Sequence, residues 1–340
     1  MATQFETAIL EEANEAAWDA LVAAAPCGTV FQSTRWLRIV ARAFGRTPRV
    51  IGVFRNGTLV GGCPVYERRL LGFLVSDPPL LAGYAGPVLH LPDILRTGRV
   101  GSEAEQTLAA LEQALRARYA SVRIVAPPGL TDARPFLWAG WAVVPRYTYR
   151  LALRPREALI GDFEQGARRR ARRGEAAGWR AVHVSKLDGS ENTYASAYRR
   201  HGAGPPVPQS ILRALLPELL KAGLARASEL LDPTGRAHAF EVHALDERAA
   251  YALLSGTDEP ALRDGGAVLL KLEAMHDVGQ RVSEFDFLGA NTPSIATFKR
   301  AFGGTLTPYW EASRTTAAAV TLLGARRLLA RATRPLRRSG

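Results

Sequence analysis

The chain has 340 residues, of which 47% are hydrophobic, enough for two cores of ordinary size. Lysine and arginine outnumber aspartate and glutamate by 44 to 32, and the net charge of +12 favours polyanionic partners such as nucleic acid, anionic lipid or phosphorylated substrates. No stretch reaches the roughly 20 apolar residues of a membrane span, and two cysteines make neither a disulfide framework nor a zinc site, so a cytoplasmic protein is expected.

The N-terminal half is expected to combine helices with a hairpin. Met1 to Glu15 carries four glutamates and no basic residue, unlike a secretory signal peptide. Asn56-Gly57 between two apolar runs predicts a type I′ turn, and Gly61 and Gly62 in the return strand indicate a bulge or a close backbone approach. Helical patterns cover 11–25, 34–44 and 103–119. Strand patterns cover 50–54, 58–66, 121–126 and part of 138–153, and 76–87 is a Pro/Gly-rich loop.

The C-terminal half repeats this order of elements, and such a repeat favours two similar domains. Helical patterns cover 161–178, 191–201, 210–222, 265–278 and 295–302. Strand patterns cover 224–231, 236–245, 249–255 and 283–288, and a last strand is expected to end near residue 310. We therefore expect one domain over 1–155, a second over 156–315 and a basic amphipathic tail over 316–340. One large α/β domain is the alternative.

A glycine-containing loop precedes the helix that is expected from residue 265. Free N–H groups and the helix dipole favour an anion at such an end. The segment Arg263 to Val268 resembles the pyrophosphate loop of GNAT acyltransferases, which has Arg or Gln, two residues, Gly, one residue, and then Gly or Ala. Arg263 and Gly266 match that pattern and Val268 does not, while Gly265 belongs to the same loop. A plain glycine turn is the alternative.

Longer segments resemble the Fem family of acyltransferases. The segment FDFLGANTPSIATFKRAFGGTLTPYWE resembles the C-terminal GNAT signature of that family, and FQSTRWLRIVARAFG and GTLVGGCPVY are similar to its first domain. The resemblance covers about Trp18 to Trp310 and implies an α/β (α+β) fold of two tandem GNAT-like domains, each a mixed, mostly antiparallel sheet flanked by helices. Some members move amino acids from aminoacyl-tRNA onto a peptidoglycan precursor, and others are expected to use acyl-CoA.

The resemblance also implies which side chains serve the acyl donor. Phe298 and Lys299 match the Phe-Lys pair that lines the family's donor site, where a fixed cation beside a developing oxyanion lowers the barrier. Tyr251 and Ser255 lie on the strand that parts from its neighbour to admit the donor, and Tyr251 resembles a family tyrosine near the acceptor. The alternatives are a solvated helix face for Lys299 and core packing for Tyr251.

The reaction also needs a group that takes a proton from the attacking amine. The base candidates are Glu241, Asp286 and Asp258. Asp286 stands between Phe285 and Phe287, so in a strand its side chain points to the face opposite both rings.

Acceptor contacts are expected in both halves. Arg199 or Arg200, before HGAGPPVP, resembles a family arginine that binds the acceptor phosphate, and a guanidinium suits such bidentate contacts. Asp77, in SDPPLLAGYAGP, is placed where the first domain would face the cleft, and Trp36 is assigned to the acceptor as well. A turn-capping aspartate is the alternative for Asp77.

Two arginine-rich segments are suited to polyanions. Gly166 to Gly174 places five arginines on one helix, which suits RNA phosphates, and the tail over 316–340 combines leucines with arginines, which suits an anionic membrane surface. A solvated basic face and a frayed tail are the alternatives. The six histidines show no metal-ligand spacing and no G-x-S-x-G motif occurs, so neither a metal enzyme nor a serine hydrolase is expected.

Three functions follow from these observations. The first is an aminoacyltransferase of the Fem type that uses aminoacyl-tRNA and a lipid-linked or nucleotide-linked cell-wall precursor. The second is an acyl-CoA-dependent N-acyltransferase in polysaccharide or lipid assembly, and the third is a non-catalytic nucleic-acid or membrane-binding protein on a degenerate GNAT scaffold. We expect no permanently bound cofactor, a monomer, and peripheral contact with the inner membrane face.

Overall fold

The computed structural model describes residues 5–89, 99–187, 191–199 and 204–321. The strands of these residues form a 13-stranded sheet in the order β1-β2-β3-β4-β6-β13-β7-β12-β11-β10-β9-β8, with β5 beside β3. The strands are β1 (Phe5–Ile9), β2 (Thr47–Arg55), β3 (Thr58–Leu70), β4 (Phe73–Ser76), β5 (Val88–Leu89), β6 (Ser121–Val125), β7 (Ala142–Ala152), β8 (Arg180–Val184), β9 (Ala225–Leu231), β10 (Ala237–Leu245), β11 (Ala249–Thr257), β12 (Glu284–Asp286) and β13 (Thr305–Thr315). The α-helices are α1 (Glu15–Ala24), α2 (Thr34–Ala43), α3 (Arg99–Arg118), α4 (Arg134–Trp138), α5 (Arg156–Asp162), α6 (Gln165–Ala176), α7 (Asn192–Arg199), α8 (Gln209–Lys221), α9 (Glu259–Arg263), α10 (Gly266–Val278) and α11 (Pro293–Arg300), and the 3-10 turns are η1 (Glu12–Asn14), η2 (Val30–Gln32) and η3 (Leu80–Ala82).

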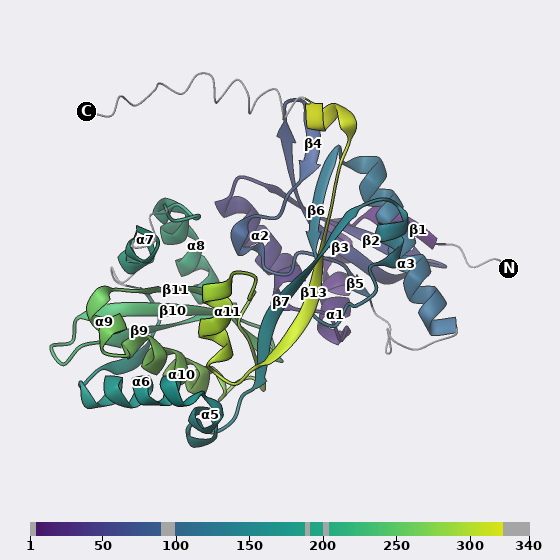
Figure 1. Cartoon of the computed structure of the whole chain (residues 1–340). Helices are drawn as coiled ribbons and strands as arrows, with labels where there is room; N and C mark the ends of the chain where they lie inside the picture. The colour runs from purple at the N-terminus through teal and green to yellow at the C-terminus, as the bar shows by residue number, and fades with distance from the viewer. Residues whose placement is uncertain (1–4, 90–98, 188–190, 200–203, 322–340) are drawn as a thin grey trace.

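Helices cover both faces of the sheet in the second half. Figure 1 shows α7 and α8 on one face and α6 and α10 on the other. A core formed by α5, α6, α10 and β12 lies on the α10 side, whereas the leucines of α8 join the larger core that α1, α2 and the strands of the first half build. The second half therefore shares its core with the first half on one face and has a core of its own on the other.

Two long strands, β7 and β13, join the halves and cross the middle of the molecule in Figure 1. They pair with each other along most of their length. β7 continues the sheet into β12, and the end of β13 pairs with β6. The last strand, which was expected to end near residue 310, therefore extends to Thr315 and lies between two strands of the first half. The boundary that is expected at residue 155 falls between β7 and α5.

The expected hairpin is confirmed, with glycines where the backbone needs them. Asn56 and Gly57 both have positive φ, +50° and +79°, as a type I′ turn requires. A register shift interrupts the pairing of β2 with β3 just before Gly61. A Cβ on Gly61 would lie 2.9 Å from the carbonyl oxygen of Val88, and one on Gly62 would lie 2.8 Å from the Trp18 ring. Both the bulge and the close approach are therefore present.

The structure corrects two expectations of secondary structure. β1 occupies the acidic N-terminus, where no strand was expected, and pairs with β2. The single basic helix expected over 161–178 is two helices, α5 and α6. Phe163 has an extended backbone and ends the first helix. Its ring is buried 5.0 Å from the ring of Phe302, and Glu164 N–H donates to the Ala301 carbonyl at 2.9 Å. Burial of one aromatic side chain here outweighs the helical propensity of its neighbours.

Candidate active site

β11 and β12 run parallel and then part. Their pairing covers Ala249 to Tyr251 on β11 and Glu284 to Asp286 on β12, although β11 continues to Thr257. A register shift against β10 leaves Leu253 of β11 without a partner there. No described strand therefore pairs with the outer edge of β11 beyond Tyr251.

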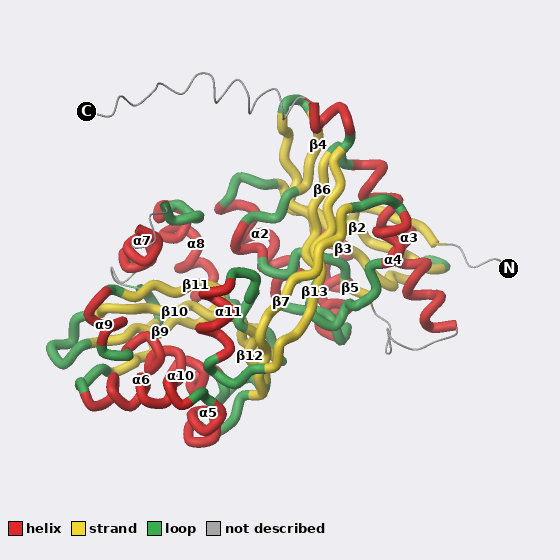
Figure 2. Tube along the Cα trace, in the orientation of Figure 1, coloured by secondary structure: helices red, strands yellow, loops and turns green. Residues whose placement is uncertain are grey.

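Lys299 lies at the place where these strands part. Figure 2 shows α11, which carries it, beside β11 and β12. Its ammonium donates to the carbonyl oxygens of Phe287 at 2.5 Å and Gly289 at 2.6 Å, and Leu288 O is 3.5 Å away. Burial lowers the pKa of Lys299 to about 8, helped by the charge of Lys271. A largely buried cation is therefore held against the turn that follows β12.

Two other residues assigned to the donor flank this point. Phe298 is exposed, and its ring meets Phe302 edge-on at 5.1 Å. Ser255 is exposed on β11 and lies opposite Glu241 of β10. Both side chains are thus open to a ligand on the unpaired stretch of the sheet.

The turn after β12 is held from both of its sides. Leu288 and Gly289 have φ values of +50° and +92°, a conformation that is costly for leucine. Leu288 N–H donates to Asp286 Oδ1 at 2.8 Å, and Gly289 N–H donates to Thr148 Oγ1 at 3.1 Å. Lys299 binds the carbonyls of the same turn. These bonds fix the position of the ammonium, because side chain and turn restrain each other.

Asp286 connects this turn to the first half of the chain. It is fully buried, and as its place in the strand predicts, its carboxylate points away from both neighbouring phenyl rings. Tyr84 donates its hydroxyl to both oxygens, at 3.1 and 3.0 Å, and Thr148 donates at 2.7 Å. Arg150 Nε lies 3.5 Å from Oδ2. Burial raises the pKa of Asp286 against the opposing effect of these donors.

Tyr251 lies in the core between the halves. Its ring meets Phe31 at 4.9 Å and Tyr84 at 6.3 Å, and its hydroxyl donates to Asp246 Oδ2 at 2.7 Å. Burial first, and the Asp246 charge second, raise the pKa of Tyr251. The side chain is only 3% exposed. Core packing, the alternative that the sequence left open, therefore describes its contacts.

The loop before α10 owes its glycines to close packing. Gly265 has φ +85°, and a Cβ there would lie 2.2 Å from the Arg170 carbonyl oxygen of α6. A Cβ on Gly266 would lie 2.5 Å from the side chain of Leu230. The guanidinium of Arg263 extends into solvent, with 72% of the side chain exposed. The two glycines thus let α6 approach the first turn of α10, and Arg263 lies exposed beside it, 3.9 Å from Asp264 Oδ1.

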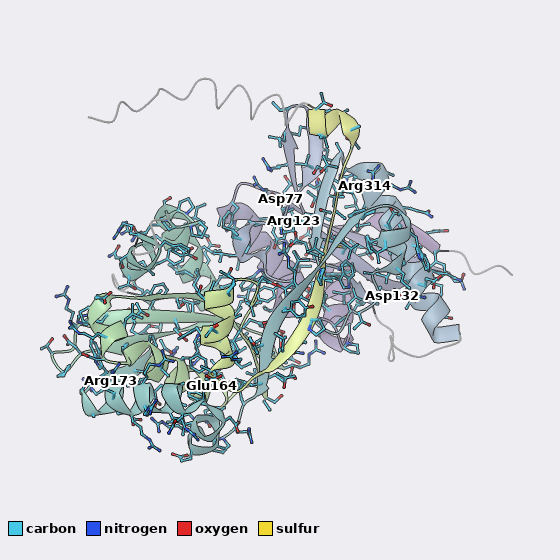
Figure 3. All side chains as sticks on the ribbon, viewed as in Figure 1. Asp77, Arg123, Asp132, Glu164, Arg173 and Arg314 are labelled. Carbon is cyan, nitrogen blue, oxygen red and sulfur yellow. The ribbon has the colours of Figure 1, made fainter. Side chains whose placement is uncertain are left out.

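One arginine side chain of α6 binds this loop. Arg173 donates to the Arg263 carbonyl at 2.5 Å, and Figure 3 shows it on α6 at the end of the second half. Arg169, Arg170 and Arg172 are exposed, and their side chains make no hydrogen bond or ion pair within the described part of the chain. Three of these cations therefore lack partners in the described part of the chain, and we call the four residues Arg169, Arg170, Arg172 and Arg173 the α6 arginine face.

A family comparison identifies the half of the chain that carries these features. The model of the acetyltransferase (GNAT) domain matches residues 161–300. Residues 161–300 form a GNAT domain. The match takes in the loop before α10, the parting strands and Lys299, and it shows that the chain is an acyltransferase.

Solved structures extend the likeness to the whole chain. FemX has a TM-score of 0.70 at 14% identity, with 94% of this chain and 99% of that chain covered. A tandem GNAT protein from the clavulanic acid biosynthesis pathway has 0.55 at 15%, with 92% and 98% covered, and the C-terminal domain of a lysylphosphatidylglycerol synthetase from Agrobacterium fabrum has 0.55 at 13%, with 94% and 98% covered. At such low sequence identity the structural likeness shows the fold alone. It confirms the Fem-like tandem GNAT arrangement. No curated protein sequence matches the chain.

The GNAT domain also buries a charged cluster that the sequence did not reveal. Lys271 of α10 binds Glu241 Oε1 at 2.7 Å, and His243 Nε2 lies 3.2 Å from Glu241 Oε2. The Lys271 ammonium lies over the rings of Phe285 at 5.7 Å and Phe287 at 5.9 Å. Burial raises the pKa of Glu241, but Lys271 and His243 outweigh it and the net shift is downward, while burial lowers the pKa of His243.

Two of the three base candidates are engaged in structural bonds. Glu241 is buried against Lys271. Asp258 caps α9 by accepting from Ala261 N–H at 3.3 Å, and it lies 2.7 Å from His238 Nδ1. Of the three, Asp286 alone among the described residues bonds the turn that Lys299 holds.

The residues assigned to the acceptor lie apart. Trp36 is fully buried, 5.0 Å from Phe31, so its ring offers no surface to a ligand. Asp77 accepts from Arg123 Nε at 2.9 Å, and Figure 3 shows this pair in the first half. Arg199 ends α7 with its side chain exposed, and Arg200 lies outside the described residues. No hydrogen bond, ion pair or ring contact in the described part of the chain joins Asp77 or Trp36 to Lys299.

Sequence reasoning missed three contributors to this site: Tyr84, Thr148 and Lys271. A usable signal existed for Lys271, because a lysine inside the apolar run Val268 to Leu272 needs a buried partner.

Residues 322–340, which make up most of the expected basic amphipathic tail over 316–340, lie outside the described residues. Within the part that is described, no helix is long and apolar enough to cross a membrane. Both cysteines are free and buried, as expected.

Proposed function

We propose that the protein transfers an aminoacyl group from aminoacyl-tRNA to an amine of a peptidoglycan precursor. The observation that supports this donor is the α6 arginine face, in which Arg173 binds the loop before α10 and three exposed guanidinium groups lack partners in the described chain. A small donor with a pyrophosphate needs a helix end and one or two cations. A wider row of arginines matches the phosphates of an RNA strand. The Fem-like fold of the whole chain supports the same donor.

The reaction places few demands on the protein. The amine nitrogen attacks the ester carbonyl of the aminoacyl group, the new C–N bond forms, and the C–O bond to the ribose breaks. The proton lost by nitrogen passes to the base and then to the leaving ribose oxygen. We assign Lys299 to the developing oxyanion, because its ammonium is fixed where β11 and β12 part. We assign Asp286 to the proton, because it alone of the three candidates bonds the turn that holds Lys299.

A second candidate is transfer from acyl-CoA. Arg263 and Gly266 match the pyrophosphate pattern, and a helix N-terminus follows them at Gly266. On this alternative the α6 arginine face is a solvated surface, and the acceptor belongs to polysaccharide or lipid assembly.

Donor titration separates these candidates. Charged tRNA and acetyl-CoA are titrated against the full chain at two fixed salt concentrations, because phosphate contacts weaken steeply with salt. We expect charged tRNA to bind and acetyl-CoA to stay silent. The variant Arg169→Glu/Arg172→Glu should weaken tRNA binding at least ~10-fold and flatten its salt dependence. Arg236→Glu, an exposed arginine on the β9–β10 turn, is the matched control. Tight acetyl-CoA binding that Arg263→Ala abolishes would overturn the proposal.

A further inference from the structure

Behind the site, the GNAT domain buries three ionisable side chains that the proposed chemistry does not use. They are Lys271 of α10 and Glu241 and His243 of β10, and none exposes more than 6% of its side chain. Glu241 Oε2 and His243 Nε2 lie 3.2 Å apart, yet neither atom has a hydrogen-bond partner in the described structure. Apolar side chains of similar volume are often at least as stable as a buried ion pair, so stability alone does not account for this cluster.

A row of aromatic rings joins the cluster to the helix that carries Lys299. The His243 ring lies 5.3 Å from Phe285, Phe285 lies 4.9 Å from Phe287, and Phe287 lies 5.6 Å from Phe302. Phe302 comes just after the end of α11. All four rings are buried, and in a close-packed interior a shift of one side chain is passed to the next. The cluster and α11 therefore belong to one packed unit.

Phe287 contacts both buried lysines. Its ring lies 5.9 Å from the Lys271 ammonium, within the range of a cation–π contact, and the Phe285 ring lies 5.7 Å from the same ammonium. The carbonyl oxygen of Phe287 accepts the 2.5 Å hydrogen bond from Lys299. One residue thus links the place of the Lys299 ammonium to the place of Lys271.

Three buried charges act on the Lys299 ammonium from three elements. Lys271 of α10 repels it, and Asp286 of β12 and Glu241 of β10 attract it. Asp286 also accepts from Leu288 N–H, so it is a part of the turn that Lys299 binds. Lys271 and Glu241 act from behind the turn, where the field of a charge is screened much less than in water.

Other charged groups of the described chain around the site face partners of their own. Arg300, the neighbour of Lys299 on α11, lies 3.1 Å from Glu164, and both side chains are more than half exposed. Arg150 of β7 lies 2.5 Å from the half-exposed Glu284. Water screens such pairs. Burial lowers the pKa of His243, which therefore adds no charge at neutral pH. The buried pair of α10 and β10 thus supplies charge that solvent does not screen.

We propose that Lys271 and Glu241 are positioning residues for Lys299, which hold the rings behind its turn and balance the field at its ammonium with their opposite charges. Neither touches the reacting atoms. Lys271 favours loss of the Lys299 proton and Glu241 opposes that loss, so the pair sets the pH up to which the cation is present. The consequence for transfer rests on the proposed function, whereas the coupling between the charges does not.

The test is an NMR titration of the Lys299 ε-carbon in the full chain with isotopically labelled lysine. The chain has four lysines, and the exposed Lys186 and Lys221 serve as internal references. Lys271→Met removes a repelling charge, so the titration midpoint of Lys299 should rise by at least ~0.5 pH unit. Glu241→Gln removes an attracting charge, so the midpoint should fall by about as much. The variant Lys299→Met assigns the signal.

Opposite shifts distinguish an effect of charge from damage to the core. A loosened core would admit water to Lys299 and raise its midpoint in both variants, because burial is the main cause that lowers it. A rise in both variants, or a shift in neither, would overturn the proposal. Lys271→Arg/Glu241→Gln repeats the second measurement with a cation that keeps its proton, and its midpoint should lie below that of Lys271→Arg. This pair also decides the question if Lys271→Met does not fold.

A matched control removes a buried carboxylate elsewhere. Glu112 of the first half accepts from the Trp141 ring nitrogen, so Glu112→Gln should lower stability and leave the midpoint of Lys299 unchanged. Urea unfolding and circular dichroism check each variant. In the transfer assay the alkaline decline should move upward in Lys271→Met and downward in Glu241→Gln. Midpoints that shift while the rate profile stays fixed would contradict the role assigned to Lys299 only, and fixed midpoints would contradict this inference only.

Discussion

The two halves of the sheet bury their charged groups differently. In the first half, Glu67 accepts from Tyr119 and from Arg118, both at 2.7 Å, and Glu112 accepts from the Trp141 ring nitrogen at 2.8 Å. About a third of the Arg118 side chain is exposed. These carboxylates are neutralised by cations that reach in from solvent, so water screens the pairs.

In the GNAT domain one buried pair, Lys271 and Glu241, has both partners taken out of water. Lys271 and Glu241 each expose 6% of their side chains, and His243 exposes 1%. Lys299 keeps its ammonium against backbone carbonyls nearby. Fields between such groups are much less screened than at the surface. The first half therefore screens its buried carboxylates with exposed cations, whereas the GNAT domain keeps a buried ion pair whose field is little screened.

The largest expected effect on stability comes from breaking the buried pair of Lys271 and Glu241. Lys271→Met leaves Glu241 charged and without its partner inside the protein, which should lower the free energy of unfolding by about 3–5 kcal/mol. Arg118→Met removes the comparable partner of Glu67 in the first half and should cost only about 1 kcal/mol. Urea unfolding measures both.

The double variant Lys271→Met/Glu241→Gln distinguishes an effect of the unpaired charge from a simple packing effect. If the unpaired charge is the cause, the second substitution should restore a large part of the stability that the first one removed. Equal costs for Lys271→Met and Arg118→Met would refute the contrast between the halves.

The second-largest expected effect follows from loss of the Lys299 ammonium. Lys299→Met should lower kcat roughly 100- to 1,000-fold with little change in donor affinity, because the cation acts on the oxyanion. Arg300→Met, at the neighbouring exposed cation, is the matched control.

The same lysine sets a pH limit. Because the pKa of Lys299 is lowered to about 8, the ammonium is present below that pH and is lost as pH rises through it. The transfer rate should therefore decline above about pH 8 in the wild-type chain. A flat profile up to pH 10 would show that the charge of Lys299 does not enter the rate.

Gly57 and Gly265 should differ in how much an alanine substitution destabilises the protein. Gly57 of the first half has φ +79° with nothing within 4 Å of its missing Cβ, so Gly57→Ala should cost only about 1 kcal/mol. Gly265 has a similar φ, but its Cβ would meet a backbone oxygen of α6, so Gly265→Ala should cost about 2–4 kcal/mol. Thermal unfolding and tRNA titration report the two consequences, stability and the position of the α6 arginine face. Equal costs would mean that α6 shifts freely.

Local chemistry explains which features could be predicted from the sequence. The Asn56-Gly57 turn needs only its own backbone preference, and Lys299 was found because its segment resembles a family signature. α5 and α6 were merged because the burial of Phe163 depends on Phe302, far along the chain. The position of β13 between β6 and β7 likewise depends on pairing between segments that sequence patterns treat separately.

The site shows the same limit. Tyr84 and Asp286 are 202 residues apart in sequence, and no local pattern relates them. Glu241 was named from the sequence as a base candidate, but its partner Lys271 lies on another element. Residue types could be predicted, therefore, while their pairing required the fold.

The smallest expected effect concerns the contact between the halves. Tyr84→Phe removes a hydroxyl that donates to buried Asp286, which keeps its bonds from Thr148 and Leu288, so we expect a loss of about 1–2 kcal/mol in unfolding free energy. Tyr66→Phe is the matched control, because the buried Tyr66 hydroxyl has no hydrogen-bond partner in the described structure and its removal should be neutral or stabilising. If Asp286 also takes the proton in catalysis, losing this donor should make it a stronger base, and the acidic limb of the pH–rate profile should move upward in Tyr84→Phe alone. An unchanged acidic limb would show that Asp286 stabilises the turn at Leu288 and does not take the proton.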